Sequence, residues 1–97
     1  MTHPDLLDLV PEYLKRRNQD AIQIKNLISH HDFIAIQILS HKMHGSGKMY
    51  GFEAISTIGR ELEAAAIENN LNLIESLNKA LLNYLQSLDS SGAHEKN

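Results

Sequence analysis

Apolar residues recur at spacings of three and four through four stretches of the chain, and this pattern constrains the fold more than any other feature. No stretch alternates apolar and polar residues as a half-buried strand would. The spacing predicts helices over about 11–29, 33–50, 52–68 and 71–88. Short turns join these segments, so neighbouring helices run antiparallel. We therefore predict an all-α, antiparallel up-down-up-down four-helix bundle.

Individual residues mark the ends of these helices. Pro11 suits the first position of the first long helix, where its missing N–H costs nothing. Residues 6–10 are expected to form a short N-terminal helical segment that covers one end of the core. Asp32 is a good N-cap for the second helix, and Gly51 is a natural stop at its end, because glycine adopts the left-handed conformation readily.

The length of the chain limits it to one domain, which we take as residues 1–97 with the bundle over about 10–88. The small and polar residues 90–97 are expected to form a disordered tail. A bundle of this size has a core but no deep substrate cavity. Any chemistry must therefore take place on the outside of a helix.

Composition excludes several classes of protein. The formal net charge of −3 argues against a nucleic-acid-binding protein, which normally carries a basic face. The chain has no cysteine, so it has neither disulfides nor a thiolate metal site. No apolar run approaches the roughly 20 residues of a membrane span, and the first residues lack the basic-then-apolar order of a signal peptide. We expect a cytoplasmic, monomeric protein.

The stretch 40–51 departs from this ordinary pattern, because it holds two histidines, two lysines and three glycines. A glycine in a helix interior costs roughly 0.5–1 kcal/mol relative to alanine. Gly45 and Gly47 therefore mean either that the helix ends here or that something needs the space.

Counting 100° per residue separates this helix into two faces. The face opposite His41 forms a continuous core seam, which predicts one helix through the glycines: Ile36, Leu39, Met43, Ser46 and Tyr50. The face of His41 carries two apolar residues, an amide, a second histidine, a glycine and a lysine: Ile34, Ile38, Gln37, His44, Gly45 and Lys48. Lys42 lies at the edge of this face. Gly45 thus leaves access to His41, whereas Gly47 lies nearer the core seam, where close helix packing explains it.

This combination suits phosphoryl transfer. A neutral imidazole is nucleophilic near pH 7, because its unperturbed pKa is about 6.5. The transferred group spreads negative charge over three oxygens, so nearby cations assist the reaction. The exposed Ile34 and Ile38 offer a docking surface, unless a neighbouring segment covers them. The chain has no phosphate loop or kinase signature, so the donor must be another protein.

At these residues the sequence resembles the histidine-containing phosphotransfer (HPt) domain family. The family pattern is read here as His41, Met43, His44, Gly45, Ser46, Gly47 and Gly51. His44 departs from the pattern, since lysine is usual there, and Lys42 and Lys48 could compensate for the lost fixed charge. The family fold is a four-helix bundle with this histidine midway along the second helix. Some members place a glutamine on the third helix facing the histidine ring, and Glu63 stands at the matching spacing.

The resemblance implies a phosphorelay intermediate. His41 would accept a phosphoryl group from the aspartate of a response-regulator receiver domain and pass it to another receiver, with Lys42, His44 and Lys48 in support. Receivers and a hybrid sensor kinase are the implied partners. They would dock on a surface of five residues: Ile34, Gln37, Ile38, Gly45 and Lys48. The magnesium ion belongs to the receiver, so we expect no cofactor in this chain and no ATP-dependent kinase activity.

Two other readings stay open from the residues. A non-catalytic bundle could bind a receiver or another signalling protein without phosphotransfer. A metal binder could use His41 and His44, which are three residues apart. No third ligand of suitable spacing presents itself, and we therefore expect no native metal site.

Overall fold

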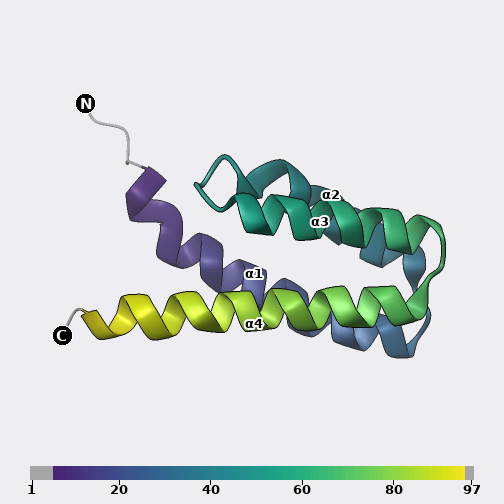
Figure 1. Ribbon diagram of the computed structural model, residues 1–97. Helices are drawn as coiled ribbons and strands as arrows, with labels where there is room; N and C mark the ends of the chain where they lie inside the picture. Colours follow the sequence, from purple (N-terminus) through teal and green to yellow (C-terminus); the bar gives the residue numbers. More distant parts are fainter. Residues whose placement is uncertain (1–5, 96–97) are drawn as a thin grey trace.

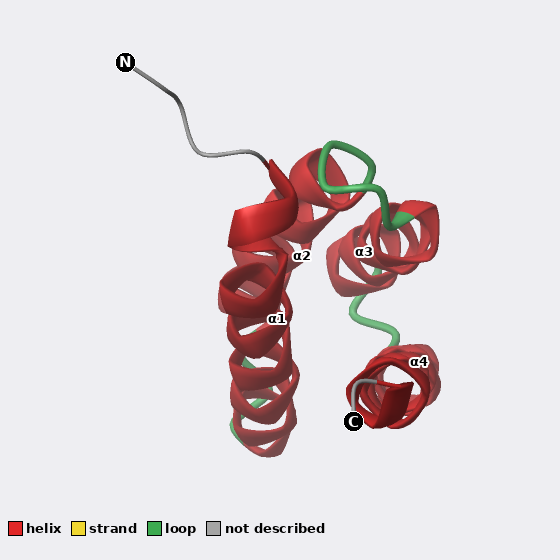
Figure 2. Ribbon diagram, turned by 90° about the vertical axis from the view of Figure 1, so that its left-hand side faces the viewer, coloured by secondary structure: helices red, strands yellow, loops and turns green. Residues whose placement is uncertain are grey.

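The computed structural model describes the backbone of residues 6–95, and the side chains of residues 9–88. Four helices follow one another without a strand in this part of the chain. Their bounds are α1 Leu6–Ser29, α2 Phe33–Gly47, α3 Glu53–Ile67 and α4 Leu71–Glu95. Each helix packs against two neighbours, in the cyclic order α1, α2, α3 and α4. Figures 1 and 2 show this bundle from two sides. The predicted all-α four-helix bundle is therefore confirmed.

The first helix begins earlier than the sequence predicted. Residues 6–10 are continuous with α1, and Pro11 lies inside the helix and not at its first position. Inside a helix, proline removes one backbone hydrogen bond and its ring crowds the carbonyl four residues earlier. Two residues later, the buried Tyr13 fixes this part of α1 against the rest of the bundle. Its ring stacks on Tyr50 with centroids 4.1 Å apart, and its hydroxyl lies 2.8 Å from Ser46 Oγ.

The start of α2 agrees with the prediction, but its end does not. Asp32 caps the helix by accepting a 3.1 Å hydrogen bond from the backbone N–H of Ala35. The helix ends at Gly47, three residues before the predicted Tyr50. In a continued helix the amide of Lys48 would bond the carbonyl of His44. Here a hydroxyl from α3 forms hydrogen bonds with both of these groups.

The hydroxyl of Ser56 ends α2 and joins it to α3. It donates to the carbonyl oxygen of His44 and accepts from the amide of Lys48, both at 2.8 Å. The turn that follows contains Gly51 at φ +90°, a conformation that suits glycine. Gly47 lies against this turn so closely that an added Cβ would come within 2.5 Å of the Ser56 backbone nitrogen. The sequence interpretation of Gly47 as a close-packing residue agrees with this contact.

The last two helices follow the predicted pattern closely. Asn69, at φ +54°, closes the turn between them, and the side chain of Asn70 accepts a 3.2 Å hydrogen bond from the backbone N–H of Leu73. We expected a disordered tail over 90–97, but α4 continues to Glu95, and residues 96–97 lie outside the described residues. No helix in the described part of the chain is long and apolar enough to cross a membrane.

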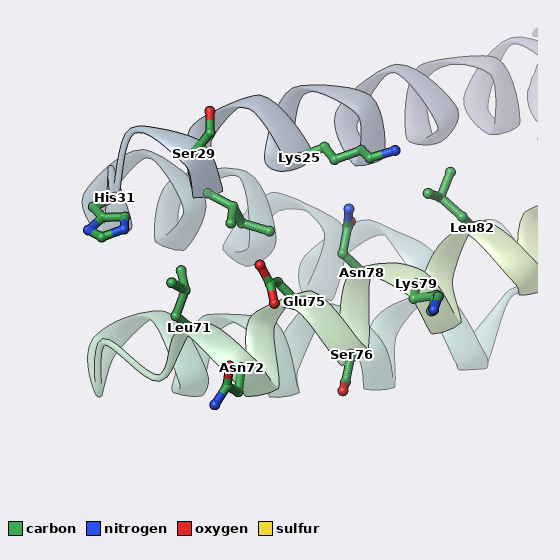
Figure 3. Close-up of a pocket in the computed structure, with 11 residues that line it drawn as sticks. Lys25, Ser29, His31, Leu71, Asn72, Glu75, Ser76, Asn78, Lys79 and Leu82 are labelled. Carbon is green, nitrogen blue, oxygen red and sulfur yellow. The ribbon is translucent and has the colours of Figure 1, made fainter.

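The core lies along the axis of the bundle and draws on all four helices. Its fully buried members with large side chains are Ile24, Ile36, Met43, Ile55, Leu62, Ile74 and Leu81. One polar side chain, Asn78, is 3% exposed and donates a 3.0 Å hydrogen bond to the carbonyl oxygen of Ala21, so it links α4 to α1. Beside it, an open groove of about 850 Å³ runs between these two helices (Figure 3). None of the predicted site residues lines this groove.

Candidate functional site

His41 stands on the outer face of α2. Its side chain is 72% exposed, although the preceding Ser40 and the nearby Met43 are fully buried. The buried seam of α2 consists of Ile36, Ser40, Met43 and Gly47. The prediction is confirmed for the buried Ile36 and Met43. Leu39 and Tyr50 are half-buried and pack against the core, and Ser46 is half-buried. Two of the four buried residues, Ser40 and Gly47, are small, and the hydroxyl of Ser40 donates a 2.7 Å hydrogen bond to the carbonyl of Ile36.

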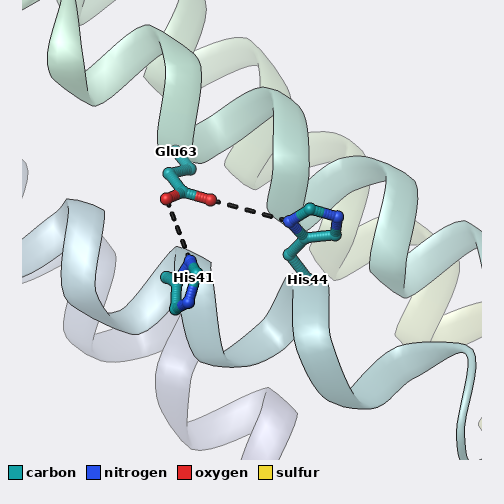
Figure 4. Close-up of side chains that lie close together, drawn as sticks. All are labelled: His41, His44 and Glu63. Carbon is teal, nitrogen blue, oxygen red and sulfur yellow. Dashed lines mark hydrogen bonds and ion pairs between the residues drawn. The ribbon is translucent and has the colours of Figure 1, made fainter.

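Glu63 on α3 faces the His41 ring. Its Oε2 lies 3.0 Å from His41 Nδ1, as Figure 4 shows. An ionised carboxylate only accepts hydrogen bonds, so Nδ1 carries the hydrogen in this pair. In a neutral imidazole the lone pair then lies on Nε2, the nitrogen farther from the backbone. The geometry therefore sets the tautomer that leaves Nε2 nucleophilic.

His44 approaches the same carboxylate from one turn farther along α2. Its Nδ1 lies 3.6 Å from Glu63 Oε1, and its side chain is 41% exposed. The rings of His41 and His44 meet edge to face, with centroids 6.4 Å apart. The distance to Glu63 is too long for a good hydrogen bond, but a protonated His44 would form an ion pair there. One carboxylate thus serves both imidazoles (Figure 4).

Two glycines shape the approach to this cluster from opposite sides. An added Cβ at Gly45 would meet no heavy atom within 4 Å, so the space beside His41 on α2 is open. Gly59 on α3 is buried, and an added Cβ there would come within 2.6 Å of the His44 backbone nitrogen. The missing side chain of Gly59 therefore lets α3 approach α2 and brings Glu63 within reach of both rings. The sequence analysis did not single out Gly59.

The lysines predicted to support the site differ in their surroundings. Lys48 lies at the C-cap of α2 and is exposed. Lys42 is also exposed, and its charge acts on Asp20 of α1. Burial raises the pKa of the Asp20 carboxyl, while Arg17, whose Nε lies 3.0 Å from it, and Lys42 lower it in part. Lys42 thus lies near enough to α1 for its charge to act on Asp20.

Three of the five predicted docking residues lie on α2 before His41, and Gly45 and Lys48 follow it. The side chains of Ile34 and Ile38 are 72% and 53% exposed, which is high for isoleucine. No neighbouring segment of the described chain covers them, so that alternative is excluded for these residues. Gln37 between them is half-buried. Together with Gly45 and Lys48 they form one side of the surface around His41.

Comparison with known proteins agrees with this arrangement. The model of the Hpt domain matches residues 5–91 of the chain. The chain belongs to the Hpt domain family. No curated protein and no solved structure matches it. Hpt domains act in phosphorelays by histidine phosphotransfer, and they generally pair with receiver domains.

A third potential metal donor lies beside His41 and His44. We reasoned that His41 and His44 lack a third ligand for a metal ion. Glu63 on α3 brings a third potential donor, because a donor atom from each of the three residues lies within 4.8 Å of the others. The third group was missed because it comes from another helix, which spacing within α2 does not reveal.

Proposed function

We propose that this Hpt domain carries its phosphoryl group on Nε2 of His41, and that it relays the group between receiver aspartates. The observation that carries the proposal is the 3.0 Å contact of His41 Nδ1 with Glu63 Oε2. It leaves the lone pair on the exposed nitrogen. Of the two histidines beside Glu63, His41 has the shorter contact, 3.0 Å against 3.6 Å, and the more exposed side chain, 72% against 41%.

The reaction follows from this tautomer. The Nε2 lone pair of His41 attacks the phosphorus of a receiver aspartyl phosphate. The bond from phosphorus to the aspartate oxygen breaks, and its electron pair leaves on the receiver carboxylate. No proton has to move, because Nδ1 keeps its hydrogen throughout. The positive charge that develops on the ring is stabilised by the Glu63 carboxylate, since opposite charges at this distance attract.

The neighbouring residues have different proposed roles. Lys48 and a protonated His44 offer positive charge to the phosphoryl oxygens, and Lys42 offers it from the edge of the face. Gly45 lets the receiver approach in line with Nε2. The receiver contributes the Mg²⁺ ion and a surface that covers Ile34, Gln37 and Ile38. The upstream source of the phosphoryl group is proposed to be a hybrid sensor kinase.

The test uses ³²P-labelled receiver domains, each incubated with the 97-residue chain. We expect label on the chain that is labile in acid and stable in base, and none on the His41→Gln variant. His30→Gln is the matched control, because His30 is exposed in the α1–α2 turn, away from Glu63. Receiver binding without any label would instead establish the non-catalytic binding reading. Equal labelling of the His41→Gln variant would rule out His41 as the acceptor.

A further inference from the structure

We infer that His41, His44 and Glu63 together form a binding site for a divalent transition-metal ion, with Zn²⁺ as the best fit. The three donor atoms come from two packed helices and lie within 4.8 Å of one another. The group is only partly open to water, because the Glu63 side chain is 21% exposed and that of His44 is 41% exposed.

The distances suit a metal ion without movement of the backbone. Zinc binds imidazole nitrogens and carboxylate oxygens at about 2.0–2.2 Å, and tetrahedral donors at that radius lie about 3.4 Å apart. His41 Nδ1 lies 3.0 Å from Glu63 Oε2, His44 Nδ1 lies 3.6 Å from Glu63 Oε1, and one donor atom from each of the three residues lies within 4.8 Å of the others. Rotations of these side chains would bring the donors to the tetrahedral spacing.

The types of donor select the class of metal. Two imidazoles and one carboxylate suit Zn²⁺ and similar ions, whereas Mg²⁺ and Ca²⁺ prefer oxygen ligands throughout. Three protein ligands leave one tetrahedral position for water. His41 is open enough to admit that water, since its side chain is 72% exposed.

The backbone holds these ligands in place before any metal arrives. His41 and His44 are on successive turns of α2, and the close contact of Gly59 with the His44 backbone fixes the distance to α3. The hydroxyl of Ser56 on α3 also donates a 2.8 Å hydrogen bond to the backbone carbonyl of His44. A site on two rigid, cross-linked helices loses little conformational entropy when it binds a metal.

Metal binding at this site opposes phosphotransfer, and this part of the inference rests on the proposed function. A metal on His41 Nδ1 takes the lone pair of that nitrogen, so the ring hydrogen must lie on Nε2. Nε2 then has no lone pair to attack phosphorus. The metal also binds the Glu63 carboxylate, which otherwise stabilises the phosphorylated ring. Zinc would therefore hold the domain in a form that cannot accept a phosphoryl group.

The binding test is a calorimetric titration of the untagged 97-residue chain with ZnCl₂. We expect one site whose affinity falls by roughly tenfold or more in the His44→Lys and Glu63→Gln variants, because loss of even an outer-shell partner has an effect of this size. The His44→Lys variant keeps a positively charged hydrogen-bond donor at this position but loses the imidazole nitrogen that binds the metal. The double variant His30→Gln/His31→Gln is the matched control and should bind as the wild type does.

A spectroscopic measurement needs no variant. In ¹⁵N-histidine NMR spectra of the wild type, zinc should shift Nδ1 of both His41 and His44 and move the ring hydrogen to Nε2. Absence of zinc binding would overturn the inference. So would a site that the His44→Lys and Glu63→Gln variants leave intact, or zinc shifts confined to other histidines.

The consequence for phosphotransfer is tested by labelling from a phosphorylated receiver with and without buffered zinc. We expect zinc to suppress labelling of the wild type, and to leave unchanged whatever labelling the His44→Lys variant shows. That variant also reports any effect of zinc on the receiver itself. Zinc bound at the cluster with labelling unaffected would refute the antagonism. A wild type that takes no label without zinc would refute the proposed function and leave the metal site standing.

Discussion

Substitutions of Gly45 separate the effect on access to His41 from the effect on the stability of the domain. An added Cβ at this position meets no heavy atom within 4 Å. Replacing a helical glycine by alanine or glutamine then stabilises the helix by about 0.5–1 kcal/mol. For a domain of this size that corresponds to a rise in melting temperature of about 2–8 °C. The Gly45→Gln side chain nevertheless projects beside His41, where the receiver must approach.

We expect Gly45→Gln to reduce the rate of label transfer from a phosphorylated receiver by roughly tenfold to a hundredfold, since displacement of the reacting atoms by about 1 Å has an effect of that size. Gly45→Ala should give the same gain in stability and a smaller loss of transfer. The assays are thermal unfolding followed by circular dichroism, and the initial rate of ³²P transfer at a fixed receiver concentration.

Gly47 and Gly59 provide the contrast. A Cβ at either position would come within 2.5–2.6 Å of a backbone nitrogen. Gly47→Ala and Gly59→Ala should each destabilise the domain by about 1–3 kcal/mol through overpacking. The reasoning is refuted if Gly45→Gln lowers the melting temperature as these two variants do, or if it transfers label as fast as the wild type.

Three further substitutions test other parts of the structure. Glu63→Gln should slow labelling of His41 on the order of tenfold without weakening receiver binding, because a charge-assisted hydrogen bond is worth roughly 1.5 kcal/mol more than a neutral one; an unchanged rate would contradict the role of the carboxylate. Ser56→Ala should lower the free energy of unfolding in urea by about 1–3 kcal/mol, since it leaves the His44 carbonyl and an amide unpaired, and a loss below about 0.5 kcal/mol would contradict this account of the end of α2. Because burial raises the pKa of Asp20 above 3.8, its stabilising contribution is present below pH 3.8 and is lost as pH rises through the folded-state value. The difference in unfolding free energy between the wild type and the Asp20→Asn variant should therefore decrease as the pH rises through the folded-state pKa of Asp20. A difference that stays constant across pH would contradict this prediction.

The exposed half of the site could be predicted because helical periodicity places residues around a helix directly. His41, Ile34, Ile38 and Gly45 all lie on the outer face expected from 100° per residue. The position of Glu63 opposite His41 was suggested by the family resemblance, and the structure shows the contact. Periodicity alone would not have distinguished Glu63 from other acidic residues on a solvated face.

The buried seam of α2 was harder to predict. Apolar spacing favoured Leu39 and Tyr50, but the bundle buries Ser40 and Gly47, which are small and have weak hydrophobic signals. Close approach of α3 selects small residues, and that approach depends on Gly59 of the other helix. Such pairwise fits between helices are not visible in either segment alone.

Polar residues that hold helices together were missed for a similar reason. Ser56 bridges two backbone groups of α2, and Asn78 links α4 to α1. A serine or an asparagine at a buried helical position breaks the apolar pattern, so the sequence assigns it to the surface. Only the partner on the other helix explains its burial.

The most direct test of the central claim identifies the atom that carries the phosphoryl group. The chain is labelled with ¹⁵N-histidine, phosphorylated by a receiver domain and examined by NMR for coupling between phosphorus and nitrogen. The account predicts coupling to Nε2 of His41, with the hydrogen retained on Nδ1. Phosphorus on Nδ1 of His41, or on His44, would contradict it.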